Sequence, residues 1–401
     1  MTPEGPLGGG DPFEGMPFLG DIARLLGQQG GMAWDSARQL AMSIATDGTS
    51  EPNVDPADRM AIEQLARVAD LHVADVTGLS TSVNGRTLTV VPVNRTRWVQ
   101  VSLDAYRPLV EKLAGSLGPS GSGEPDDPLA PADPMGGMFA GMMEMLQPMV
   151  LAMTAGSMVG HLAKRSLGQY DLPIPRPATG PADELLLVVP NLGAFADEWS
   201  LAADDLRLWV CVHEIAHHAV LGVPHVRARM DDLLDRYVSA FRNDPGAFED
   251  QIGQVDPGDP NALARLQDLM GSPDVILGAI TSPEQHALRP QLEALVAVVA
   301  GVVDHVLDEV GAKLIPSYPM LTEALRRRRV EAAESDRFVE RLFGLELAQS
   351  TYDRGEAFVE GVLERAGEEG LRRLWADAEN LPTPPEVDAP GLWLARLDLD
   401  T

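Results

Sequence analysis

The feature that most constrains this chain is a pair of histidines four residues apart inside a predicted helix. Residues 204–222 open on two aspartates that can cap a helix, end on Gly222, and precede Pro224. Pro224 is predicted to prevent the helix from resuming. The segment HEIAH at 213–217 therefore falls in the interior of a helix rather than in a loop.

The spacing of the two histidines is typical of a metal site. Residues i and i+4 of an α-helix lie about 40° apart on one face, so His213 and His217 can bind one ion. Glu214 lies about 100° from His213, where its carboxylate can accept a proton from a metal-bound water. This HExxH pattern predicts a zinc-dependent hydrolase with Glu214 as general base. The alternative is a pair of histidines that are merely packed or solvated.

Residues near the motif exclude one class of zinc peptidase and indicate how the neighbouring side chains pack. The metzincin pattern requires glycine at 220 and histidine at 223, and Val220 and Val223 exclude it. Cys211 is expected to be an inert buried thiol, since it lies nearly opposite the motif on the helix. Trp209 is expected to pack beneath the site, and His218 to be solvated.

The charge balance and the cysteine content limit the partners and the compartment. The chain has 401 residues, 45% of them hydrophobic, which is enough for a large core. Its net charge of −29 disfavours nucleic acid and membrane surfaces as partners. A single cysteine excludes an intrachain disulfide and, with no signal peptide in the N-terminal residues, predicts a cytoplasmic protein.

Composition also suggests how the chain is divided. Residues 1–18 are rich in glycine and proline and are predicted to be disordered. A helical N-terminal region is expected over 19–114, followed by a Gly/Pro/Ser linker or loop over 115–134. Residues 135–395 are then predicted to form the catalytic region.

Local signals place several further elements. Asp55 is predicted to start a helix whose apolar residues recur at helical spacing, namely Met60, Ile62, Leu65, Val68 and Leu71. A second helix is expected from about Thr96 to Leu113 with a kink at Pro108, and a strand over 185–190. Asn84-Gly85 is a weak hairpin signal.

Two other stretches have unusual compositions. The Met-rich residues 135–158 are interpreted as buried helices rather than a membrane span, because charged and helix-breaking residues interrupt them. Residues 382–390 are expected to form an extended tail that Trp393 anchors.

A set of short sequences around the motif resembles a known family. The set is GQYDLP at 168–173, VPN at 189–191, LWV at 208–210, VP at 223–224, DHV at 304–306, GLEL at 344–347, Tyr352 with Gly355 and FV at 358–359, and ENLPT at 379–383. In this order they resemble the zincin-like zinc metallopeptidases of actinomycete-type bacteria, over about residues 20–395. The resemblance implies a mainly α, zincin-like fold with little β structure, hydrolase activity and bound Zn²⁺. It assigns the family's histidines and glutamate to His213, His217 and Glu214.

One position departs from the family's pattern. The family usually has a Glu-Gly pair where this chain has Ala300-Gly301, and that glutamate is the natural third zinc ligand. A catalytic zinc site needs three protein ligands and a water. Asp304, one turn further along the same face, is the predicted substitute, with Glu293 and His305 as alternatives.

Two functions follow from these observations. The first is a zinc metallohydrolase, expected to be a peptidase acting on a peptide or protein substrate. The second is a catalytically degenerate zincin-like scaffold that acts by interaction, because Ala300 replaces the usual ligand. An apolar wall at that position would favour the scaffold.

Overall fold

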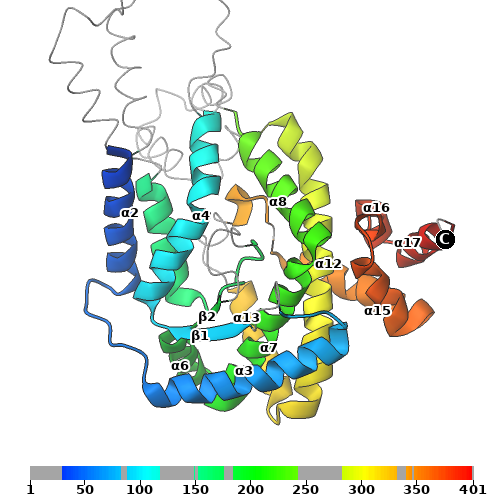
Figure 1. Cartoon of the computed structure of the whole chain (residues 1–401), viewed down its shortest axis with the longest axis horizontal. Coiled ribbons are helices and arrows are strands. Elements are labelled where there is room, and N and C mark those ends of the chain that lie inside the picture. The colour runs from blue at the N-terminus through cyan, green and yellow to red at the C-terminus, as the bar shows by residue number, and fades with distance from the viewer. Residues whose placement is uncertain are drawn as a thin grey trace, which may run out of the picture.

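The protein is mainly helical with one short pair of strands, which confirms the predicted fold class (Figure 1). The computed structural model describes residues 29–82, 88–117, 149, 152–175, 184–242, 282–331, 340–345 and 347–399. Buried apolar side chains from all of the longer helices form one continuous core.

The N-terminal helices cover one side of this core. Helices α2 (Gln29–Ala45) and α4 (Arg95–Leu117) pack together, and the helix over 152–165 lies against α2. That last contact is close, because a Cβ on Gly156 or Gly160 would meet the backbone of α2. Helix α4 confirms the helix expected from about Thr96, and Pro108 lies inside it.

Helix α3 (Pro56–Thr77) crosses the lower part of the molecule and contacts the motif helix (Figure 1). Asp55 caps it as predicted, because its side chain accepts a hydrogen bond from Ala57 N at 2.7 Å. The predicted apolar face was only partly right. Ile62 is buried, but Met60 and Leu71 are exposed, and alanines and Val73 complete the buried face.

The two strands pair in parallel across a long stretch of sequence. Strand β1 (Thr89–Val93) lies beside β2 (Glu184–Val188), with Thr89 opposite Glu184 and Val93 opposite Val188. Strand β2 confirms the strand expected from 185 onward, and helix α6 (Val189–Glu198) follows it directly. The hairpin signal at 84–85 lies outside the described residues.

Helix α7 (Ala203–Gly222) carries the motif and is surrounded by other elements. It contacts α3, α6, α8 (Pro224–Ser239), α12 (Pro283–Leu314) and β2. Two boundary predictions were wrong. The N-cap is Ala202 rather than an aspartate, and Pro224 starts α8 instead of preventing a helix, because proline fits the first helical turn.

Helices α12, α13 (Tyr318–Val330) and α15 (Gln349–Arg372) complete the core around α7 (Figure 1). The contact between α12 and α15 is the most extensive one between described elements. It depends on Gly301 and Gly355, since a Cβ on either would overlap the backbone of the other helix. This packing fixes α12 beside the motif.

The C-terminal residues form short helices rather than the extended tail that was expected. Two 3₁₀ turns, Arg373–Trp375 and Ala378–Asn380, precede α16 (Pro384–Val387) and α17 (Pro390–Leu399). Trp393 is buried, and its indole N–H donates to Asn380 O at 2.6 Å, so the predicted anchoring role is correct.

Several sequence predictions fall outside the described residues. These are the disordered segment at 1–18, residues 118–134 of the predicted linker and most of the Met-rich stretch. The first linker residues, 115–117, are helical and end α4. The predicted domain boundaries therefore stay predictions. Among the residues that are described, no helix combines the length and the apolar character needed to cross a membrane.

Candidate metal centre

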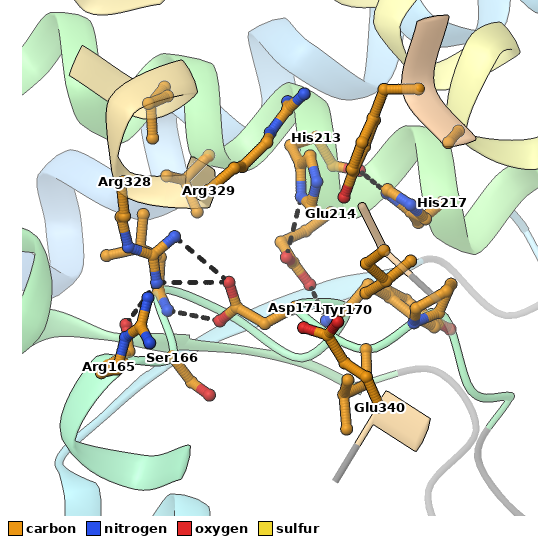
Figure 2. Close-up of a pocket in the computed structure, with 18 of the residues that line it drawn as sticks. Arg165, Ser166, Tyr170, Asp171, His213, Glu214, His217, Arg328, Arg329 and Glu340 are labelled. Carbon is orange, nitrogen blue, oxygen red and sulfur yellow. Dashed lines mark hydrogen bonds and ion pairs between the residues drawn. The ribbon is translucent and has the colours of Figure 1, made fainter. Parts of the chain in front are cut away.

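The two motif histidines and Glu214 open onto one cavity of about 120 Å³. Helix α7 supplies all three side chains, and the loop at 166–173 forms the facing wall (Figure 2). Helices α12, α13 and α15 close the remaining sides. The structure thus brings together the three motif residues that the sequence predicted.

Each histidine has one ring nitrogen engaged by the protein. The Nδ1 atom of His217 lies 3.0 Å from the carbonyl oxygen of His213, and Nδ1 of His213 lies 3.1 Å from Oε1 of Glu214. The carbonyl oxygen can only accept, so the proton of His217 lies on Nδ1, and an ionised Glu214 imposes the same tautomer on His213. In that state the Nε2 lone pair of each ring is available. The ring centroids lie 4.4 Å apart.

Aromatic side chains hold the two imidazoles from either side. Trp209 stacks on His213 with 5.1 Å between ring centroids, which confirms its predicted place beneath the site. Tyr170 stacks on His217 at 5.7 Å. Burial lowers the pKa of His213 to about 4 and that of His217 to about 3. Both rings are therefore neutral near pH 7, as metal ligands must be.

Glu214 is almost completely buried and is held by the backbone of the facing loop. Its side chain is only 1% exposed, and Oε2 accepts hydrogen bonds from the backbone N–H groups of Gln169 and Tyr170, each at 2.8 Å. Burial, helped by the nearby charge of Asp171, raises its pKa to about 8. A carboxyl with a pKa near neutrality is suited to exchange protons at that pH.

The loop that closes over Glu214 is fixed from three directions. The indole N–H of Trp98 donates to Gly168 O at 2.7 Å, and Val188 N at the end of β2 donates to Leu167 O at 2.9 Å. Asp171 accepts from Leu167 N at 2.6 Å within the loop. Gly168 itself lies so close to Glu214 that a Cβ there would overlap the carboxyl group.

Zinc fits only part of this arrangement. His213 and His217 present the donor atoms that zinc prefers, and both line one cavity. However, the described residues include no group of three His, Cys, Asp or Glu side chains that could hold a metal ion. The structure therefore assembles two of the three protein ligands that a catalytic zinc site requires.

The candidates for the third ligand all lie elsewhere. Ala300 lines the histidine cavity, whereas Asp304 lines a neighbouring one and pairs with Arg329 at 3.4 Å. Glu293 pairs with Arg289 at 3.2 Å, and His305 lies 3.2 Å from a glutamate of α15. One helical turn, about 6 Å along the axis, separates Asp304 from Ala300.

Sequence reasoning missed the arginines of the cavity wall. Arg165, Arg328 and Arg329 all line it. Figure 2 shows Arg328 facing Asp171, 3.5 Å away, and Arg329 extending beside His213. The run of four arginines at 326–329 was visible in the sequence, but its place beside the motif depends on how α13 packs against α7.

Two predictions about neighbours of the motif have opposite outcomes. Cys211 is fully buried as expected, and burial raises the pKa of its thiol far above the usual range, which disfavours the reactive thiolate. His218 is buried instead of solvated, and its Nδ1 lies 3.4 Å from the hydroxyl of Tyr170. The prediction failed because α7 is covered on every side.

Comparisons with known proteins identify a family and a shared fold. A family model described as a zincin-like metallopeptidase matches residues 32–394. A crystal structure from Chloroflexus aurantiacus, described as "a putative hydrolase with a novel fold", is similar with a TM-score of 0.58 and 23% identity. The match covers 91% of this chain and 98% of that one, and at this identity it shows a shared fold. No curated protein matched the chain.

The contact between Gly168 and Glu214 can be tested by adding one methyl group. Gly168→Ala should lower the free energy of unfolding by about 1–3 kcal/mol, because the carboxyl must move from its hydrogen bonds. Gly222→Ala, at the end of α7, is the control, since nothing lies within 4 Å of its added Cβ. Urea denaturation measures both. Equal stabilities for the two variants would contradict the described loop packing.

Proposed function

Because this chain belongs to the zincin-like metallopeptidase family, we propose that it is a zinc-dependent hydrolase of peptide bonds. His213 and His217 are the proposed zinc ligands and Glu214 the general base. The observation that carries this proposal is the shared cavity, onto which both imidazoles open with Nδ1 engaged by hydrogen bonds. The substrate class follows from the family, and a peptide or protein is the expected partner.

Bound zinc would supply a polarised carbonyl and a water acidic enough to lose a proton near neutral pH. Glu214 would accept that proton and pass it to the leaving amine. Its carboxylate stays in place during this transfer because Gln169 and Tyr170 hold Oε2 through their backbone N–H groups. His213 remains oriented by its Nδ1 contact with Oε1.

A second function has a specific observation in its favour. Ala300 lines the cavity where the resemblance places a ligand, and Asp304 is paired with Arg329 in the next cavity. The alternative is a degenerate member that binds metal weakly through two histidines and acts by interaction. Asp304 as third ligand stays a prediction, and it requires the carboxylate to leave Arg329.

The two functions share further expectations. The net charge of −29 disfavours nucleic acid and membrane surfaces as partners. A single buried cysteine is compatible with the reducing cytoplasm proposed as the compartment.

Replacing the proposed base tests the first function. In zinc-loaded protein, Glu214→Gln should reduce peptide hydrolysis by at least about 100-fold, because an amide cannot accept the proton. Hydrolysis is measured on a mixture of unstructured peptides by mass spectrometry. Zinc content is measured on the same samples, so that loss of metal is distinguished from loss of the base. Glu198→Gln, at an exposed position of α6, is the control and should leave activity unchanged. Activity that survives Glu214→Gln would mean that the chemistry occurs elsewhere.

Zinc titration of variants separates the two functions. His217→Ala should abolish zinc binding, since one histidine remains. Ala300→Glu should tighten binding by at least about tenfold, or 1.4 kcal/mol, by adding a carboxylate to the cavity wall. A sharp loss of affinity in Asp304→Ala would identify Asp304 as the third ligand and support the enzyme. Weak binding by the wild type that Asp304→Ala leaves unchanged would support the degenerate scaffold.

A further inference from the structure

The histidine cavity shares a wall with a larger cavity of about 520 Å³. Trp209, Leu325, Arg329 and Tyr352 line both spaces. Together the two cavities have the volume of a small-molecule or short-peptide site. The shared wall is therefore the surface that a ligand reaching from one cavity into the other must touch.

The indole N–H of Trp209 in this wall has no hydrogen-bond partner among the described residues. The Trp209 side chain is only 5% exposed. An indole N–H is a donor only, so a ligand that satisfies it must bring an acceptor. Leaving such a donor unpaired and buried is costly, which makes the position a candidate for ligand binding.

Arg329 adds a positive charge to the same wall. Its guanidinium lies 4.2 Å from the centre of the Tyr352 ring and makes one long contact, 3.4 Å, with Asp304. A guanidinium has several N–H donors in a planar fork that matches a carboxylate. Most of that donor capacity is therefore not used by Asp304.

The charges around the wall direct an anion to the histidine side. Arg165 and Arg328 also line the histidine cavity, together with three carboxylates. Asp171 and Glu214 accept hydrogen bonds from the backbone, and Glu340 is the third. The larger cavity is lined by more carboxylates, among them Asp308, Glu356 and Glu360. A bound anion is repelled there and attracted toward Arg329.

We propose that Trp209 and Arg329 form a carboxylate-binding subsite beside the candidate metal centre. Trp209 stacks on His213 at 5.1 Å, and one residue of extended chain spans about 3.3–3.6 Å. A peptide whose carboxylate is bound at Trp209 thus places the bond one or two residues away at the histidines. The subsite deepens the proposed function by naming its substrate class, but binding there requires no bond cleavage.

The carboxylate has two sources, which the probes distinguish. Acetyl-Ala-Ala has a free C-terminal carboxylate, acetyl-Ala-Ala-amide has none, and acetyl-Ala-Glu-amide carries one on a side chain. Each is titrated into the full chain with ¹⁵N-labelled tryptophan, and the indole N–H resonances are followed by NMR. The Trp209 resonance is assigned from its loss in Trp209→Phe, a variant that keeps an aromatic ring over His213.

The expected result is a saturable shift of the Trp209 indole resonance with a carboxylate probe and none with the neutral amide. A response to acetyl-Ala-Ala identifies a site for C-terminal carboxylates, and a response to the glutamyl probe alone identifies a site for acidic side chains. Arg329→Gln and Trp209→Phe should each weaken calorimetric binding at least about fivefold. Arg327→Gln, exposed on the same helix and outside both cavities, is the control and should bind like the wild type.

The result that overturns the subsite is equal binding of acid and amide, or carboxylate binding that leaves the Trp209 resonance unmoved. Thermal unfolding of each variant shows whether it is folded. The binding assay also separates this proposal from the proposed function. Carboxylate binding at Trp209 without hydrolysis supports the subsite and contradicts the proposed hydrolase activity. Equal hydrolysis of the carboxylate and amide peptides, with no shift of the Trp209 resonance, supports the proposed hydrolase activity and contradicts the subsite.

Discussion

The site depends on how one buried carboxylate is satisfied. Glu214 lies on a helix enclosed on all sides, and burying an unpaired charge costs several kcal/mol. The backbone N–H groups of Gln169 and Tyr170 and the ring of His213 offset part of that cost, and the remainder raises the pKa of the carboxyl. The loop can approach this closely only because residue 168 is glycine. The same few contacts therefore set the position of the loop at 166–173, the orientation of His213 and the pKa of Glu214.

The same packing explains why the centre is incomplete as a three-ligand site. Helix α12 is held against α15 by the close approach of Gly301 and Gly355, which fixes Ala300 in the cavity wall. Asp304 is one turn further along and meets Arg329 instead of the histidines. A rigid helix contact of this kind leaves little freedom for Asp304 to reach the metal. The wall that lacks a zinc ligand is instead rich in hydrogen-bond donors, which is why an anionic ligand fits it.

Local signals predicted much of this fold, and long-range contacts account for what they missed. The cap at Asp55, the strand from 185 and the motif helix follow from neighbouring residues, and each is present. The three motif residues share a cavity because helical spacing alone puts them on adjoining faces. The parallel pairing of β1 with β2, the loop over Glu214 and the pairing of Asp304 with Arg329 join distant segments, which no local pattern specifies. The prediction that Pro224 prevents a further helix was wrong because a proline that ends one helix also fits the first turn of the next.

Anomalous X-ray diffraction at the zinc absorption edge, from crystals grown with zinc, tests the central claim most directly. The account predicts one anomalous peak within about 2.0–2.3 Å of Nε2 of both His213 and His217, and its loss in His217→Ala crystals. The ligands around that peak would also identify any third protein group. A zinc peak bound elsewhere, or an empty cavity at saturating zinc, would contradict the assignment of this centre as a metal site.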